Sequence, residues 1–168
     1  MRISDALLPE VEQEMAQTRK TLERVPDGQF SFKPHEKSMT MGALALHIAM
    51  MADWGADTLT TDNFDVAPVG GPAYVMPTAN NTAEVLALFD KAVASFKKNL
   101  AATENDAMMK PWSLLQGGAP MFTLPRAAVI RGMILNHLVH HRGQLTVYLR
   151  LCNVPVPALY GPSADEQN

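Results

Sequence analysis

Four stretches of the sequence repeat apolar residues at alternating spacings of three and four, and this periodicity restricts the fold more than any other feature. Such spacing places the apolar side chains on one face of an α-helix. The stretches are residues 4–25, 38–54, 81–100 and, approximately, 123–152. We therefore expect four long amphipathic helices.

Polar residues at the starts of these stretches support their boundaries. Ser4, Ser38 or Thr40, and Asn81 are residue types that cap helix N-termini. Glu84 follows Asn81 by three positions, which is the spacing of a capping box. The buried stripe expected for the third helix is Val85, Phe89, Ala92, Phe96 and Leu100.

The connections between the expected helices indicate their order in space. Residues 61–80 form a linker rich in Gly and Pro between the second and third helices. Antiparallel neighbours need only a short loop, so a linker of this length indicates a crossover along the bundle. Only residues 119–124 offer a weak strand pattern. The sequence predicts a single all-α domain over residues 1–168, a four-helix bundle in up-down-down-up order with a long crossover between helices 2 and 3.

Charge and cysteine content narrow the classes of partner. The formal net charge of −3 and the absence of a basic stripe argue against a nucleic-acid surface. No apolar run approaches membrane-spanning length, and the N-terminal segment lacks the features of a signal peptide. The single cysteine, Cys152, cannot form an intramolecular disulfide. We expect a cytoplasmic protein that binds neither nucleic acid nor membrane.

Three histidines occur within five positions of the fourth expected helix. Each helical residue advances by about 100°, so His137 and His141 lie about 40° apart on one face. Both lie near the centre of the apolar stripe, whereas His140 falls at its edge. The stripe is set by Ile130, Ile134, Leu145, Tyr148 and Cys152. The pair His137 and His141 is therefore expected to face the core.

A third imidazole is available on the second expected helix, where His47 shares a stripe with Leu44, Ile48 and Met51. If the second and fourth helices run antiparallel, His47 lies at similar depth to the pair, within about one helical turn. Buried imidazoles need hydrogen-bond partners or a metal. Histidines that are satisfied within the core remain an alternative, but three converging imidazoles favour a divalent metal ion bound by His47, His137 and His141.

Two segments resemble a known family. The sequences "KSMTMGALALHIAMMADW" and "LNHLVHHRGQLTVYLRLCNVPVPALYGPSADE" are similar to those of the DinB superfamily, which comprises metal-dependent four-helix-bundle proteins. The resemblance covers essentially the whole chain and implies an up-down-down-up bundle, often dimeric, with three histidines that hold a divalent metal. By position these ligands fall on His47, His137 and His141. Relatives include S-transferases and isomerases that use low-molecular-weight thiols, hydrolases, and many proteins of unknown activity.

The sequence leaves the activity open between two classes. Three neutral histidines leave coordination positions free, which suits a metal-dependent transferase or hydrolase acting on a small molecule, including a low-molecular-weight thiol. The alternative is a non-catalytic, stress-related bundle protein in which the metal joins two helices. Imidazole suits Zn, Ni, Fe and Cu alike, so the cofactor is expected to be a divalent metal of undetermined identity.

Further residues have roles that the sequence does not decide. Asp53 and Asp57 lie about 120° and 80° from His47 around the helix, so neither is an obvious fourth ligand. Gln144 and Tyr148 follow His141 at one-turn intervals and are candidate helpers, although packing explains them equally well. No catalytic residue is assigned. Trp54 and Trp112 are candidates to line a substrate cavity, with core packing as the alternative, and Leu86 and Val93 on the third helix suggest a homodimer interface.

Overall fold

The computed structural model describes residues 1–167 and contains long helices together with a small sheet. The helices are α1 (Ile3–Leu22), α2 (Met41–Thr60), α3 (Thr82–Ala102), α4 (Asn105–Met109), α5 (Arg126–Val129) and α6 (His137–Leu151). The strands are β1 (Asn63–Asp65), β2 (Pro111–Gln116) and β3 (Ala119–Pro125). A π-helical segment, Ile130–Asn136, joins α5 to α6.

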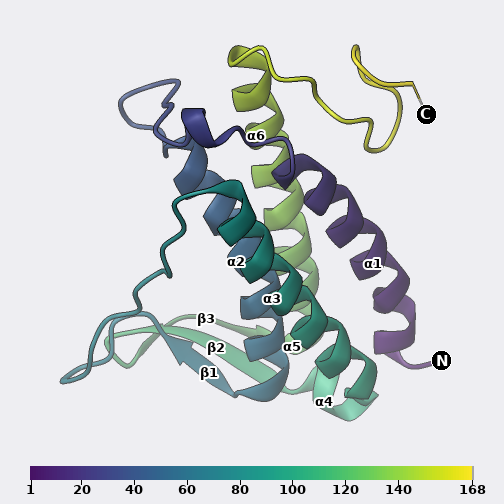
Figure 1. Ribbon diagram of the computed structural model, residues 1–168. Coiled ribbons are helices and arrows are strands. Elements are labelled where there is room, and N and C mark those ends of the chain that lie inside the picture. Colours follow the sequence, from purple (N-terminus) through teal and green to yellow (C-terminus); the bar gives the residue numbers. More distant parts are fainter. Residues whose placement is uncertain (168) are drawn as a thin grey trace.

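The long helices pack side by side, and the sheet lies at one end of them (Figure 1). Helices α1 and α6 point one way along the bundle, whereas α2 and α3 point the other. Helix α2 packs against both α3 and α6, and α1 completes the bundle by contacting α3 and α6. The chain after β1 runs back along the bundle before α3 begins. Within residues 1–167, none of the helices is both long and apolar enough to cross a membrane.

The prediction of an all-α four-helix bundle is wrong, because the chain also forms a three-stranded mixed sheet. The strand order is β1-β2-β3; β1 pairs with β2 in parallel, and β2 pairs with β3 in antiparallel fashion. Residue Thr123, near which the fourth helix was expected to begin, lies in β3 and pairs with Ser113. The helix begins instead at Arg126. The 61–80 linker contributes β1, and residues 111–125, of which only 119–124 have a weak strand pattern in the sequence, form the hairpin.

The hairpin has a sequence signal of its own in the Gly-Gly pair at its turn. Strands β2 and β3 are separated by Gly117 and Gly118, whose φ values of 62° and 79° lie in the left-handed region. A two-residue loop with positive φ at both positions matches the twist of a β-hairpin, and Gly-Gly tolerates it. Alternation in β2 is obscured because the register shifts between Leu114 and Leu115. A bulge of this kind breaks the period-two pattern.

A second departure concerns the helix that carries two of the histidines. In a π-helix each turn holds more residues than an α-turn, so side-chain directions shift relative to a regular wheel. Ile130 and Ile134, which set the expected stripe on a regular 3.6-residue period, lie in this π-helical segment. His137 is the first residue of α6, so His137 and His141 lie within regular helix and keep their i, i+4 relation.

The N-terminal capping residues predicted from the sequence are confirmed for α2 and α3 but not for α1. The Asn81 side chain accepts a hydrogen bond from the Glu84 amide at 2.9 Å, and Thr40 accepts one from the Ala43 amide at 3.2 Å. The prediction of Ser4 as a cap is wrong, because α1 begins earlier, with Arg2 at the capping position. Ser4 is buried and its hydroxyl donates to the Thr103 carbonyl.

Helices α2 and α3 form the centre of the core. The buried residues of α3 are the five expected from the sequence: Val85, Phe89, Ala92, Phe96 and Leu100. Gly55 of α2 lies against the Phe96 ring, where an added Cβ would be 2.9 Å from a ring carbon. Leu86 and Val93, proposed for a dimer interface, are partly buried and pack against this core. The homodimer stays a prediction.

Candidate metal centre

His47, His137 and His141 converge where α2 and α6 pack together. Each offers one ring nitrogen, and these three atoms all lie within 4.8 Å of one another. The His47 ring centroid is 4.6 Å from that of His141 and 5.3 Å from that of His137. All three side chains are partly buried, whereas His140 is exposed. The structure therefore brings together the three residues predicted from the sequence.

Two of these rings have partners that fix their orientation. Nδ1 of His141 lies 2.7 Å from Oε1 of Gln144, which must accept, so this nitrogen carries the proton. The Gln144 amide nitrogen lies 3.1 Å from Nε2 of His140. The His137 ring hydrogen-bonds to the backbone of Met133, one turn earlier. Partners of this kind orient histidines that bind metals, and Gln144 has the supporting position considered in the sequence analysis.

The two α6 histidines present nitrogen donors to one space. Their Nε2 atoms lie 2.8 Å apart. A neutral imidazole has only one N–H group, and the His141 proton that Gln144 accepts from Nδ1 leaves a lone pair on Nε2 of that ring. A proton on Nε2 of His137 satisfies this lone pair, and a cation bound by both Nε2 atoms satisfies it when His137 has the other tautomer. The donor set therefore fits a metal ion.

Burial also keeps these rings neutral. Burial, followed by repulsion from His141 and His137, lowers the pKa of His47 to about 4. Burial is likewise the main cause that lowers the pKa of His137 and that of His141. Histidine binds metals through a neutral nitrogen, so lowered pKa values leave the ligands available across the neutral range.

The stability of the metal-free protein is expected to depend on these shifts. The pKa of His47 is about 4 in the folded chain against an ordinary value of 6.5, so the unfolded chain binds more protons between these pH values. The free energy of unfolding should therefore fall as the pH falls from about 6.5 to about 4. Thermal unfolding in excess chelator across this range measures the effect. His47→Gln should flatten the dependence, and an unchanged slope would show that His47 is not held neutral.

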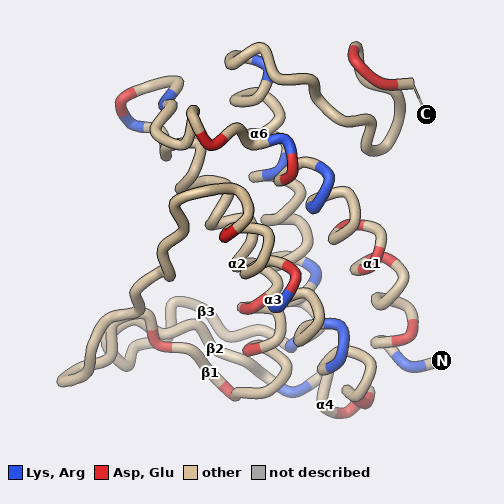
Figure 2. The backbone as a smooth tube through the Cα atoms, in the orientation of Figure 1, with Lys and Arg blue, Asp and Glu red and all other residues tan. Residues whose placement is uncertain are grey.

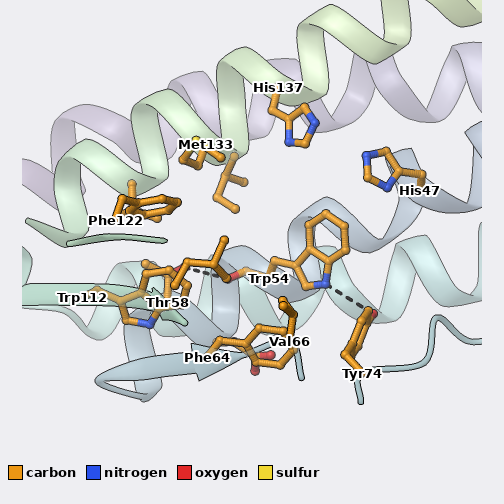
Figure 3. Close-up of a pocket in the computed structure, with 14 residues that line it drawn as sticks. His47, Trp54, Thr58, Phe64, Val66, Tyr74, Trp112, Phe122, Met133 and His137 are labelled. Atoms are coloured by element: carbon orange, nitrogen blue, oxygen red, sulfur yellow. Dashed lines mark hydrogen bonds between the residues drawn. The ribbon is translucent and has the colours of Figure 1, made fainter. Parts of the chain in front are cut away.

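A cavity of about 230 Å³ adjoins the histidines. His47 and His137 face it from one end, and the Trp54 ring lies between them and the sheet (Figure 3). Val129 and Met133 line it from the helix before His137. The remaining lining residues are Asp57, Thr58, Phe64, Val66, Tyr74, Trp112, Leu114, Phe122 and Ile134. The histidines thus open onto a space lined mainly by apolar side chains.

The other residues weighed in the sequence analysis have different positions. Trp54 and Trp112, for which cavity lining and core packing were both open, line the cavity, and so does Asp57. The Tyr148 hydroxyl donates to the Met39 carbonyl at 3.1 Å and its ring packs against Phe32, which gives it a packing role. Phe64, Leu114 and Phe122 were missed because they lie on the sheet, which the sequence analysis did not expect.

Sequence reasoning also missed a buried ion pair beside the histidines. Arg142, which directly follows His141, is 1% exposed, and its guanidinium lies 2.6 Å from a Glu14 carboxylate oxygen. It also donates to the Thr18 hydroxyl at 3.1 Å and to the hydroxyl of Tyr160. The only sequence signal is that Glu14 and Thr18 lie one turn apart on α1. This cluster holds α6 against α1.

Comparison with known proteins agrees with this fold. A relative in Bacillus subtilis (strain 168), the uncharacterized protein YrdA, is 25% identical over 162 residues, which is 96% of this chain and 90% of YrdA. A crystal structure of a DinB-like protein from Bacillus cereus superposes with a TM-score of 0.73 at 22% identity over 93% of this chain and 97% of that chain. A DinB-like protein of Bacillus subtilis, YjoA, gives a TM-score of 0.67 at 18% identity over 90% and 96% of the two chains. Residues 2–168 match the family model described as DinB family. The chain therefore belongs to the DinB family.

Proposed function

We propose that this protein binds one divalent metal ion through His47, His137 and His141 and acts on a small molecule held in the adjoining cavity. The reaction class we favour is metal-dependent group transfer or hydrolysis, including transfer to a low-molecular-weight thiol. The observation that carries the proposal is the convergence of three neutral imidazole nitrogens, all within 4.8 Å of one another, at the end of an apolar cavity.

The donor set suits an open site. In residues 1–167 the cluster contains three histidines, and no carboxylate or thiol joins them as a fourth ligand. Structural zinc sites usually have four protein ligands, whereas catalytic sites usually have three and leave a position free. When bound in such a site, a divalent ion supplies Lewis acidity, which polarises an oxygen or sulfur atom and favours its deprotonated form. Imidazole ligands are compatible with Zn, Ni and Fe.

The chain's own residues supply orientation and a dry environment. Gln144 and the Met133 backbone hold the His141 and His137 rings with their Nε2 atoms toward the shared space. Trp54, Val129 and Ile134 are among the apolar side chains that line the cavity, and apolar walls disfavour bound water. Excluding water strengthens electrostatic interactions in the site and limits competing hydrolysis of a transferred group.

A non-catalytic role is the second candidate, and the position of the histidines favours it too. His47 belongs to α2 and the other two histidines to α6, so a bound ion would link two helices that pack together. A ligand that binds only the folded state stabilises it by mass action. A purely structural metal would therefore raise the Tm without supporting turnover.

An activity screen separates the two roles. Metal-free protein is reloaded with Zn, Ni or Fe and assayed with chlorodinitrobenzene plus a panel of small thiols, and with p-nitrophenyl acetate. We expect turnover that requires the metal and is lost in His137→Ala while the circular dichroism spectrum is unchanged. A metal-dependent rise in Tm with no turnover above the His137→Ala background would contradict catalysis and support the structural role.

A further inference from the structure

The walls of the cavity suit an aromatic ligand. Five aromatic residues line it from α2, the sheet and the loop before α3: Trp54, Phe64, Tyr74, Trp112 and Phe122. Tyr74 packs edge to face against two of them, with ring centroids 6.4 Å apart for Trp54 and 5.3 Å apart for Phe64. Trp112 and Phe122, 6.2 Å apart, lie at the end away from the histidines (Figure 3). Aromatic rings stabilise one another in such arrangements beyond the area that they bury, so these walls favour a further ring.

The polar groups of the tryptophan and threonine side chains on these walls are bonded within the protein. The Trp54 indole donates to the Tyr74 hydroxyl, as Figure 3 shows, and the Trp112 indole donates to the Thr61 hydroxyl, both at 3.3 Å. The Thr58 hydroxyl donates to the Trp54 carbonyl at 2.8 Å. The surface that the cavity exposes is almost wholly apolar. A polar group on a ligand therefore loses its hydrogen bonds to water without gaining new ones here.

The cavity also offers little to a charged ligand. Within residues 1–167, neither Lys nor Arg lines it. The three strands on its sheet side carry no basic residue, as Figure 2 shows by the absence of blue along them. Asp57 is among the lining residues, but its carboxylate contributes little to a surface that is almost wholly apolar. Burial is the main cause that raises the pKa of this carboxyl, so its surroundings disfavour charge. An ionic group placed in the cavity would lose its hydration with little compensation.

The volume of the cavity limits the size of its ligand. An apolar cavity of about 150 Å³ accepts one benzene ring, whereas drug-sized ligands occupy pockets of about 300 Å³ or more. The cavity here, at about 230 Å³, lies between these sizes and fits a body of about two fused rings. We propose that it binds an uncharged, flat aromatic molecule of this size as substrate, with the reacting group toward His47 and His137.

This assignment separates the two substrates of a group transfer. A low-molecular-weight thiol that carries carboxylate or ammonium groups is charged, so it does not suit these walls. The cavity would then hold the other substrate, which donates the transferred group. The inference rests on the proposed function only for the reaction at the histidine end.

Three probes with the same ring system test the preference for an uncharged ligand: 2-naphthalenemethanol, 2-naphthoate and 2-naphthylmethylamine. The chain has two tryptophans, and both line the cavity. Their indole N–H cross-peaks in a ¹H–¹⁵N spectrum of the full chain therefore report binding. Excess chelator prevents the carboxylate from binding through a metal. We expect the alcohol to shift both peaks and to bind at least about tenfold more tightly than either ion, because burying an ion costs its hydration. Either ion binding as tightly as the alcohol would overturn the proposal.

Three further alcohols test the size and the aromatic character. Benzyl alcohol should bind about tenfold more weakly than 2-naphthalenemethanol, because it buries one ring fewer. Decahydro-2-naphthalenemethanol has the same carbon skeleton without the ring faces and should bind at least about twofold more weakly. The four-ring 1-pyrenemethanol exceeds the volume and should shift neither peak. Pyrenemethanol or the saturated alcohol binding as tightly as the two-ring probe would overturn the proposal.

Two matched variants locate the binding. Leu114 pairs with Phe122 across β2 and β3, and both line the cavity. Leu114→Trp fills part of the volume and should weaken binding of 2-naphthalenemethanol at least about tenfold. Met121→Trp introduces the same side chain on β3 at a residue that is 59% exposed and outside the lining, and it should leave the affinity within about twofold. Equal effects of the two variants, or no effect of Leu114→Trp, would contradict binding in this cavity. The comparison of probes on the unmodified chain holds even if a variant folds poorly.

Binding and turnover distinguish this inference from the proposed function. The titrations use metal-free protein, whereas the activity screen requires the metal. Selective binding of the uncharged two-ring probe supports the assignment of the cavity, and an absence of turnover would then contradict catalysis alone. Metal-dependent turnover without this selectivity would overturn the inference and leave the proposed function intact.

Discussion

Replacing His47, His137 or His141 by Ala is expected to weaken binding of a divalent metal by at least about 100-fold. Removing even a hydrogen-bond partner of a ligating histidine typically costs about 10- to 100-fold in affinity, and losing a ligand should cost more. With two imidazoles left, the cluster has too few donors to compete with water for the ion. Competition titration against a chromophoric zinc chelator measures the affinity of each variant.

His140→Ala is the matched control for this series. His140 lies on the same helix, three residues after His137, but it is exposed and contacts Gln144 rather than the shared space. We expect the metal affinity of His140→Ala to stay within about tenfold of that of the unmodified chain. A tenfold loss is the lower end of the effect of removing a residue that supports a ligand. Equal losses in His140→Ala and His141→Ala, or no loss in any variant, would contradict the assignment of ligands.

Replacing Arg142 by Ala is expected to lower the free energy of unfolding by about 3–5 kcal/mol. The Arg142 side chain is 1% exposed and the Glu14 side chain 10%, so truncating Arg142 leaves the buried Glu14 carboxylate without its charge partner, with only the neutral Tyr160 hydroxyl donating to it at 2.8 Å. Removing one member of a buried pair typically has a cost of this size, chiefly from the uncompensated charge. Urea denaturation of metal-free protein, followed by circular dichroism, measures the change.

Two further variants test whether the cost comes from the charge left behind. The double variant Glu14→Gln, Arg142→Met removes both charges and should recover a large part of the loss, because apolar replacement of a buried pair is often tolerated. Arg131→Ala breaks the solvent-exposed pair with Glu10 and should change stability by less than about 1 kcal/mol. A double variant as unstable as Arg142→Ala would indicate that packing of the Arg142 side chain, rather than charge, explains the effect.

The candidate site could be predicted because its signal is local and periodic. The i, i+4 spacing of His137 and His141 fixes their common face in any regular helix, and the structure places both in α6. His47 shares the periodicity of the buried residues of α2, and the antiparallel packing of α2 against α6 brings it to the same level (Figure 1). The stripe of α3 was predictable for the same reason.

The sheet and the cavity could not be obtained by that reasoning. Strand β1 has only three residues, and its pairing with β2 joins segments about fifty positions apart, so no local period reveals it. The readable signals were the weak strand pattern at residues 119–124, which lie in β3, and the Gly117-Gly118 turn before them, and helical periodicity took precedence over both. Phe64 and Phe122 line the cavity from strands of this sheet, so they could not be predicted without it.

The most direct test is the metal content and coordination of protein purified without a nickel column. Elemental analysis should find one divalent ion per chain, and X-ray absorption at that metal's edge should show imidazole nitrogen ligands, at about 2.0–2.1 Å if the ion is zinc. The ion should be absent from His137→Ala purified in parallel. Protein that holds no stoichiometric ion after incubation with Zn, Ni or Fe, or an ion whose ligands include no imidazole, would contradict a metal centre formed by His47, His137 and His141.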